Sequence, residues 1–155
     1  MSHQQDNNHL DQLIERFNLS PHPEGGWYKE VARSDLIVKR AGGEERSNIT
    51  SILFLLGKSD LSCWHRVNHS DEIWIYLQGS PLHLMQLDPE NKDLTCLQLN
   101  SFYPIHMVPA GYWQAAKSAG NYSLLSCCVG PGFDFDDFEM LRDLSYDLRP
   151  NKAMS

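Results

Sequence analysis

Residues 63–79 read Cys-Trp-His-Arg-Val-Asn-His-Ser-Asp-Glu-Ile-Trp-Ile-Tyr-Leu-Gln-Gly, and their pattern points to the fold class. Over residues 72–77, one face of an extended strand would carry Glu, Trp and Tyr, and the other would carry two Ile and a Leu. Because a half-exposed strand alternates apolar and polar residues, this strand is predicted to be covered on both sides. One side would face a barrel interior, and the other an N-terminal helix or a second subunit. The alternative is an aliphatic core with Glu72, Trp74 and Tyr76 on the surface.

The same period of two recurs in short runs on both sides of this strand. The segments rich in Val, Ile, Leu and aromatic residues are 27–31, 49–56, 62–66, 72–78, 82–87, 95–99, 105–108, 113–116 and 122–129. Turn-forming residues separate them, such as Asp-Pro-Glu-Asn at 88–91 and Pro-Ala-Gly at 109–111. Many short strands at intervals of about 8–12 residues predict an all-β sandwich or barrel.

The two ends of the chain show a helical period instead. Apolar residues spaced i, i+3, i+4 and i+7 predict a helix over residues 8–18, preceded by a mobile tail at 1–7. A similar spacing of Phe and Leu predicts a short C-terminal helix over 134–148. No internal repeat or linker interrupts the sequence. Residues 1–155 are therefore expected to form one domain, with the barrel over 24–130.

The composition of the chain argues against nucleic acid and membranes as its partners. The chain has 155 residues and a net charge of −7, so it lacks the cationic excess that binding to a nucleic-acid backbone needs. No apolar run reaches the roughly 20 residues of a membrane span, and the N-terminus lacks the basic and apolar blocks of a signal peptide. None of the four cysteines forms a C-x2-C pair, so free thiols in a cytoplasmic protein are expected.

Two motifs add a resemblance to a known superfamily. Glu72 is followed after six residues by Gly79, and about thirty residues later comes Pro-Ala-Gly-Tyr-Trp-Gln at 109–114. This Glu-x6-Gly and Pro-x-Gly-x-x arrangement resembles the two motifs of the cupin superfamily, whose members are small jelly-roll barrels. The fold expected on this basis is a cupin-type jelly roll with a helix at each end.

Seven blocks of sequence, in order, resemble one branch more closely: the cupin-5 family, a domain of unknown function. The blocks are 23–30, 50–56, 65–66, 71–74, 79–82, 108–114 and 131–138. The resemblance extends over residues 10–148, which is nearly the whole chain. It implies a homodimer whose structural relatives include the metal-free epimerases of dTDP-keto-deoxy sugars.

The chain departs from the metal-binding form of the cupin motif. That form, H-x-H-x3-4-E with a second-motif His, places its first His at His65 and its Glu at Glu72. Its two other positions carry Val67 and Gln114, which leaves fewer donors than non-haem iron or catalytic zinc usually has. Neither a metal nor another cofactor is therefore expected, although His69 could replace a lost ligand.

Without a metal, the same residues suit proton transfer. We expect His65 to act as a base, Glu72 as its partner or as a second proton carrier, and Tyr76 as an acid on the same face. Gln114 would hold a carbonyl or hydroxyl group of the substrate through its amide. The alternative is that His65 is a hydrogen-bonded core histidine and that Glu72 pairs with Arg66.

Other residues are candidates for contact with a ligand. Flat apolar walls would come from three aromatic residues: Trp27, Tyr28 and Trp74. Glu30 shares a face with Tyr28, so either Glu24 or Glu30 could line the mouth of the barrel. Thr50, at the start of one of the blocks that resemble the family, is also assigned to the ligand site.

Three hypotheses for function remain open at this point. The first is a metal-independent pocket for a small molecule, as in an epimerase or isomerase acting on a carbohydrate or nucleotide-sugar-like ligand. The second is a non-catalytic module that binds or senses a small ligand. The third is a metal-dependent dioxygenase or lyase-type cupin. A barrel of this type can host each of them, so the site must decide.

Overall fold

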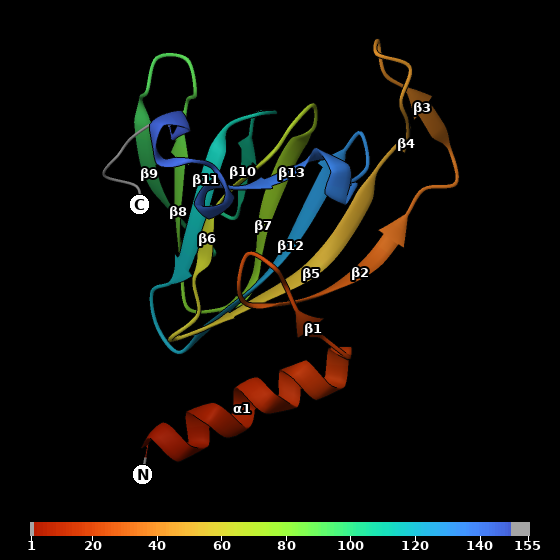
Figure 1. Ribbon diagram of the computed structural model, residues 1–155. Helices are drawn as coiled ribbons and strands as arrows, with labels where there is room; N and C mark the ends of the chain where they lie inside the picture. The colour runs from red at the N-terminus through yellow and green to blue at the C-terminus, as the bar shows by residue number, and fades with distance from the viewer. Residues whose placement is uncertain (1, 150–155) are drawn as a thin grey trace.

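The computed structural model describes residues 2–149, and the side chains of residues 9–149. It is mostly β, with one long helix, α1 (Ser2–Phe17), lying outside two facing sheets (Figure 1). The strands are β1 (Ser20–Pro21), β2 (Trp27–Arg33), β3 (Ile37–Lys39), β4 (Glu45–Ser47), β5 (Thr50–Gly57), β6 (Ser62–Val67), β7 (Asp71–Gly79), β8 (Leu82–Leu87), β9 (Leu94–Leu99), β10 (Ile105–Val108), β11 (Trp113–Ser118), β12 (Tyr122–Gly130) and β13 (Phe138–Met140).

The strands pair antiparallel in two main sheets. One sheet has the order β1-β2-β5-β12-β7-β10, and the other has the order β13-β6-β11-β8-β9. Strands distant in sequence therefore lie next to each other, as β5 and β12 do along eight paired residues. A separate hairpin of β3 and β4, which the sequence did not predict as strands, projects beyond the sheets (Figure 1). This architecture confirms the all-β prediction.

The interior between the sheets is filled with large apolar side chains. Phe54 on β5, Trp74 on β7, Leu84 on β8 and Leu125 on β12 are all completely buried in one cluster. Burying each such side chain contributes about 1.5–3 kcal/mol to stability. The strand over residues 72–77 thus turns Glu72 and Trp74 inward, as predicted. Its other face is only partly covered, since Leu77 is 47% exposed.

Helix α1 covers one end of the outer face of the six-stranded sheet. Its buried Leu13 packs against Leu55 and Leu124, which point away from the barrel interior. The helix begins at Ser2, earlier than the expected residue 8, so residues 2–7 are helical; Met1 lies outside the described residues. It ends where Asn18 takes a left-handed conformation, with φ 52°. None of the helices in the described part of the chain combines the length and the hydrophobicity of a transmembrane span.

The single helix predicted over residues 134–148 is wrong. This segment instead contains strand β13 and three short 3-10 helices: η1 (Phe135–Asp137), η2 (Leu141–Asp143) and η3 (Tyr146–Leu148). The reason is that β6 has a free edge, and β13 pairs with it in the register Phe138 to Val67 and Met140 to His65. Sheet pairing therefore overrides the local helical spacing and brings this segment over the barrel.

Candidate functional site

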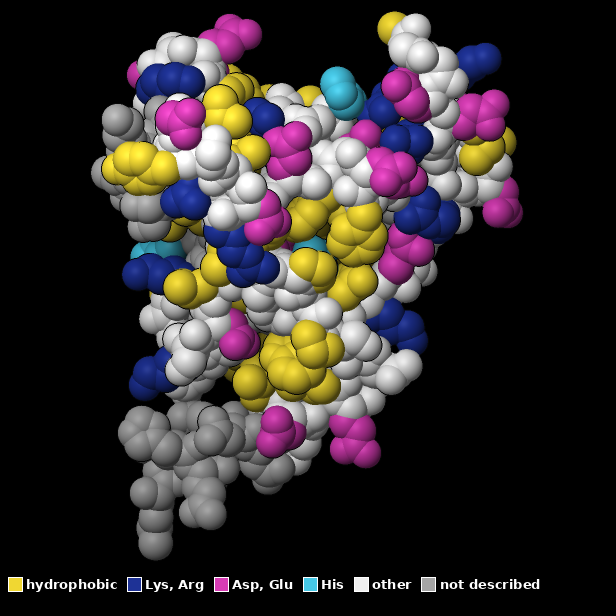
Figure 2. All heavy atoms as spheres, viewed as in Figure 1, with side chains coloured by type: hydrophobic (Ala, Val, Ile, Leu, Met, Phe, Trp, Pro, Cys, Tyr) yellow, Lys and Arg dark blue, Asp and Glu magenta, His cyan; other side chains and the backbone are white. Residues whose placement is uncertain are grey.

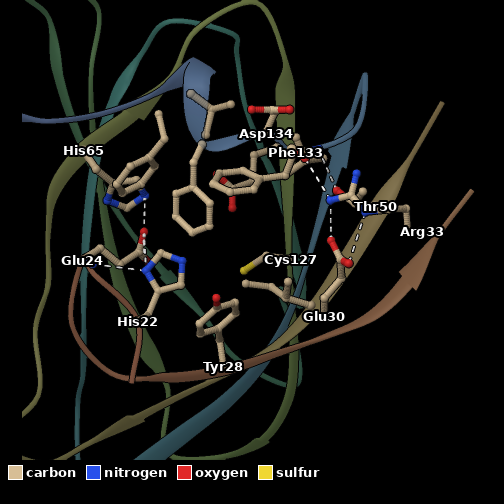
Figure 3. Close-up of a pocket in the computed structure, with 16 residues that line it drawn as sticks. His22, Glu24, Tyr28, Glu30, Arg33, Thr50, His65, Cys127, Phe133 and Asp134 are labelled. Carbon is tan, nitrogen blue, oxygen red and sulfur yellow. Dashed lines mark hydrogen bonds and ion pairs between the residues drawn. The ribbon is translucent and has the colours of Figure 1, made fainter. Parts of the chain in front are cut away.

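A cavity of about 420 Å³ opens at one end of the barrel (Figure 3). It lies between strands of the six-stranded sheet, β6 on the opposite sheet, and the segment that follows β12. In the space-filling view, apolar side chains gather on this face beside acidic and basic ones (Figure 2). The acidic, basic and imidazole side chains that line the cavity are His22, Glu24, Glu30, Arg33, His65, Glu72 and Asp134.

A buried ion pair between His65 and Glu24 forms one wall of the cavity. The Nε2 atom of His65 lies 2.9 Å from Oε2 of Glu24, and its Nδ1 lies 2.7 Å from the carbonyl oxygen of Cys63. Burial alone would lower the pKa of His65, but the charge and hydrogen bond of Glu24 raise it to about 9. Burial alone would raise the pKa of Glu24, but His65 outweighs this and lowers it. The pair is therefore an imidazolium and a carboxylate at neutral pH.

The turn between β1 and β2 places Glu24 inside the barrel. Gly25 has a φ of 111°, and a Cβ atom there would collide with the carbonyl oxygen of Leu61, so the turn requires glycine. The backbone carbonyl of Glu24 accepts a hydrogen bond from the N–H of Cys63 at 2.8 Å, and its Oε1 accepts one from the Ser62 hydroxyl at 3.0 Å. These contacts fix the carboxylate against β6, beside His65.

Glu72 lines the same cavity but has a different environment. Its Oε2 accepts a hydrogen bond of 2.5 Å from the amide of Gln114, whose Oε1 in turn accepts one of 2.7 Å from the Trp74 indole. Among residues 9–149, no hydrogen-bond donor pairs with the other carboxyl oxygen, Oε1. Burial raises the pKa of Glu72 to about 7, opposed by the positive charge of His65 and assisted by the negative charge of Glu24. Glu72 therefore changes its protonation state near neutral pH.

Two further titratable groups at the cavity are neutral at pH 7. Burial lowers the pKa of His22, against the raising effect of Glu24, and its Nδ1 accepts a hydrogen bond from the Glu24 backbone N–H at 3.1 Å. Burial also raises the pKa of the Cys127 thiol well above its ordinary value. Both groups are therefore uncharged at neutral pH, whereas Glu72, with a pKa of about 7, is partly ionised there.

The mouth of the cavity is held by contacts to the chain after β12. Arg33 donates hydrogen bonds to the Glu30 carboxylate, the shorter at 2.6 Å, and to the Phe133 carbonyl oxygen at 3.0 Å. The hydroxyl of Thr50 accepts a hydrogen bond of 2.9 Å from the backbone N–H of Phe133. Figure 3 shows these residues on the side of the cavity opposite His65. Strands β2 and β5 thereby fix the Phe133 segment over the barrel opening.

The structure brings together five of the nine residues that the sequence assigned to the site. These five line the cavity: Tyr28, Glu30, Thr50, His65 and Glu72. The expected role of His65 as a base needs correction, because a pKa of about 9 keeps it protonated at neutral pH and both ring nitrogens already have partners. The alternative pairing of Glu72 with Arg66 does not form either, since Arg66 pairs with Glu139 at 2.7 Å.

The other four assigned residues lie outside the cavity. Trp27 is on the outer face of the sheet beneath α1, and Trp74 belongs to the apolar core. The hydroxyl of Tyr76 donates to the Gly79 carbonyl oxygen at 2.6 Å, away from the site. Gln114 is buried behind Glu72 and orients that carboxyl group instead of a ligand. On β7, Glu72 lines the cavity, whereas Trp74, two residues later on the same inward face, already lies in the apolar core.

Several cavity residues were missed by sequence reasoning. Glu24 was considered for the mouth but not as the partner of His65, and His22 was not considered. By contrast, the sequence does suggest that Phe133, Phe135 or Phe138 plugs one end of the barrel, and all three rings line the cavity. The sequence feature that could have indicated the inward position of Glu24 is the Glu-Gly-Gly turn at 24–26, because such a turn beside a strand can project a side chain into the barrel.

The donor set does not suit a metal ion. Both ring nitrogens of His65 are engaged, Val67 supplies no donor, and the Gln114 oxygen is taken by the Trp74 indole. Within the described part of the chain, no group of three or more His, Cys, Asp or Glu side chains could hold a metal. We therefore derive no chemical step through a metal at this site.

Fold and site together define a double-stranded β-helix with a ligand-sized cavity at one end of its barrel. The sequence profile described as Cupin superfamily (DUF985) matches residues 11–141, so the chain belongs to this cupin-5 family. No protein of curated description matches the chain. These findings confirm the cupin jelly roll that the motifs indicated.

Solved structures agree with this assignment. A hypothetical protein from Leishmania major is 31% identical over 93% of this chain and 94% of its own, with a TM-score of 0.81. A protein from Shewanella oneidensis is 33% identical over 92% of both chains, with a TM-score of 0.80. Oxalate decarboxylase from Bacillus subtilis is only 12% identical over 84% of this chain and 33% of its own, with a TM-score of 0.61, and shows the shared fold alone.

Proposed function

We propose that the cavity is an acid–base site for a small organic ligand, and that Glu72 exchanges a proton with that ligand. The observation that carries this proposal is a carboxyl group with a pKa of about 7 and an unpartnered oxygen, facing a cavity of about 420 Å³. A general base or acid is most effective when its pKa lies near the working pH. The reaction class that fits is epimerisation or isomerisation of a carbohydrate beside a carbonyl group.

The proposed step moves one proton out and back. The ionised Glu72 carboxylate takes a proton from the carbon next to the ligand carbonyl, and the C–H electron pair moves into an enolate. Isomerisation results when protonated Glu72 returns the proton to the neighbouring carbon and the adjacent hydroxyl proton moves to the former carbonyl oxygen. Epimerisation results when the enolate turns over in the cavity and Glu72 returns the proton to the opposite face of the same carbon. Both N–H groups of the His65 imidazolium already donate to the protein, so they do not hydrogen-bond to the enolate. The positive charge of the ring stabilises the negative charge of the enolate electrostatically instead.

Deuterium exchange provides the test. A panel of ketosugars that includes a dTDP-keto-deoxy sugar is incubated with the protein in D2O, and NMR follows loss of the proton next to the carbonyl. The wild type is expected to catalyse exchange on at least one compound, and Glu72→Gln to abolish it, since glutamine cannot accept the proton. Tyr76→Phe is the matched control on the same strand face and should retain exchange. Equal exchange in Glu72→Gln would refute the role of Glu72.

A second candidate function is non-catalytic binding of a small ligand. The observation that favours it is that Cys63 and Glu24 engage both nitrogens of His65, so this histidine cannot itself exchange a proton with the ligand without losing a partner. A ligand that raises the melting temperature of wild type and Glu72→Gln alike, and is recovered without deuterium, would support this function over catalysis.

We also propose that two copies of the chain associate through the part of the six-stranded sheet that α1 leaves uncovered. There, Ile75 faces Ile105 across the β7–β10 pair, and Ile73 faces Met107; all four are apolar and at least partly exposed. Their lack of charge allows the same surface to face itself without like-charge repulsion. Light scattering should give the mass of a dimer, and Ile75→Lys should give a monomer. A monomeric wild type would refute the proposal.

We further propose a cytoplasmic location. It is supported by the four cysteines of the described chain, Cys63, Cys96, Cys127 and Cys128, which are all free thiols. Fractionation of cells followed by immunodetection should recover the protein with the cytoplasmic contents. Recovery from an extracellular or membrane fraction would contradict it.

A further inference from the structure

Three phenylalanine rings form a cluster at the mouth of the cavity. The centroids of Phe133 and Phe135 are 4.9 Å apart with their planes at 85°, and Phe138 lies 5.9 Å from each of them. The rings are steeply inclined to one another, so their faces and edges point in several directions around the opening. Tyr28 adds another aromatic ring to the lining (Figure 3). Such a set of ring faces can surround a compact group of a ligand.

The charges around the cavity leave a negative balance. Glu24 is neutralised by His65, and Glu30 by Arg33. Two carboxyl groups of the lining remain. Glu72, with a pKa of about 7, is partly ionised at neutral pH, and Asp134 interacts with the charges of Arg33 and Arg46 but forms no ion pair within 4 Å in the described range 9–149. Asp134 lies between the first two phenylalanines of the cluster in sequence, and its Oδ1 accepts a hydrogen bond from the N–H of Asp136.

From these two observations we infer that the ligand carries an ammonium group, which binds against the rings of Phe133 and Phe135 with Asp134 beside it. Phe138 is left out because its ring packs 5.5 Å from the His65 imidazolium. Cations bind favourably to the negative faces of aromatic rings, and more so where water is partly excluded. The inference rests on the proposed function in one respect, namely that this cavity is the ligand site. A carbohydrate that carries an amino group would satisfy both the proposed acid–base chemistry at Glu72 and the proposed ammonium site.

The same charges disfavour an anionic ligand. Arg33 is the only Lys or Arg side chain in the described lining, and it already donates to both oxygens of Glu30 and to the Phe133 carbonyl. A phosphate or carboxylate would have to displace Glu30 from Arg33 and approach Asp134, which would repel it. A nucleotide-sugar-like ligand with two phosphates therefore fits this mouth less well than a neutral or cationic ring.

A pair of probes that differ in charge but share their shape tests the inference. Choline and the neutral 3,3-dimethylbutan-1-ol are titrated into the full chain by calorimetry at neutral pH. Choline is expected to bind about tenfold more tightly than the alcohol, since ring faces and carboxylates favour only the cation. Equal affinities, tighter binding of the alcohol, or no binding of choline at about 10 mM would each overturn the inference.

Matched variants locate the ammonium site. Phe135→Leu should weaken choline binding several-fold and leave the alcohol nearly unchanged; Phe135 is 52% exposed, so the variant is expected to fold. Phe102→Leu is the control, because Phe102 is 97% exposed and does not line the cavity. Loss of choline affinity in both variants, or in neither, would refute the assignment to the phenylalanine cluster.

The acidic contribution is tested in the same way. Asp134→Asn removes the charge but keeps an oxygen that can accept from the Asp136 N–H, and it should weaken choline binding several-fold. The control is Asp93→Asn, on the exposed loop before β9 and outside the cavity lining. An unchanged affinity in Asp134→Asn would show that Asp134 has no part in recognition.

The outcomes separate this inference from the proposed function. Selective binding of choline without deuterium exchange on any ketosugar would support the ammonium site and leave the non-catalytic function. Exchange on a ketosugar together with equal affinity for choline and the alcohol would support the acid–base role of Glu72 and refute the ammonium site.

Discussion

The two ends of the barrel interior use the same strands but are filled in opposite ways. On β5, Thr50 lines the cavity while Phe54 is completely buried in the core. On β7, Glu72 lines the cavity while Trp74, two residues later on the same face, is fully buried. One end is thus packed with apolar groups, and the other encloses ionisable groups around an open space (Figure 3).

The two ends of the barrel are therefore expected to contribute differently to the stability of the fold. The apolar end removes hydrocarbon surface from water, which is the main favourable contribution to folding. The cavity end buries the Glu24–His65 pair and Glu72, and the desolvation of such charges offsets most of what their attraction contributes. We therefore expect the packed end to dominate the free energy of unfolding, and the cavity end to dominate its dependence on pH.

The largest expected effect is at the packed end. Leu125→Ala should lower the free energy of unfolding by about 4 kcal/mol, since it leaves a void in the close-packed core. Val129→Ala, on the same strand but facing the cavity, should cost only about 1 kcal/mol because the site already adjoins open space. Denaturation in urea measures both, and equal losses would abolish the distinction between the two ends.

The next effect is on the buried pair. Glu24→Gln should destabilise the protein by about 3 kcal/mol at neutral pH, because it leaves the His65 imidazolium buried without its counter-charge. NMR titration of the His65 ring should show its pKa falling from about 9 in the wild type. A His65 pKa that stays near 9 in this variant would show that Glu24 is not what holds the proton.

Alkaline pH provides a third measurement. The pKa of His65 is about 9 in the folded protein and 6.5 ordinarily, so its stabilising contribution is complete below pH 6.5 and is lost as the pH rises through 9. The free energy of unfolding should fall by about 2 kcal/mol between pH 7 and 9. His65→Gln should remove this slope, and a slope that persists in that variant would point to another group.

The smallest effect is at Tyr76, which the sequence assigned to catalysis. Tyr76→Phe removes the hydrogen bond to the Gly79 carbonyl and should cost about 1 kcal/mol of stability. Its ligand binding and deuterium exchange should match the wild type, since the hydroxyl points away from the cavity. A loss of exchange comparable to that of Glu72→Gln would place Tyr76 in the site after all.

Local patterns predicted the fold better than the site. Alternation along β5 and β7 was sufficient to predict strands and the inward face of β7, and the family blocks predicted the jelly roll. The outward face of β7 is only partly covered. The same alternation put Trp74 and Tyr76 on the face of Glu72, but could not tell how far along that face the cavity extends. The boundary between the cavity and the apolar core along β7 depends on side chains from the opposite sheet, such as Leu84, which packs in the same core cluster as Trp74.

The sequence alone determined the β-rich architecture, the N-terminal helix, and the presence of His65 and Glu72 on inward faces, because side-chain periodicity is set within each strand. Only the tertiary structure decided that Glu24 pairs with His65, that Gln114 donates to Glu72, and that the C-terminal segment forms a strand on β6. Each of these depends on strand pairing and barrel closure between segments distant in sequence, and no local period encodes which side chains then meet.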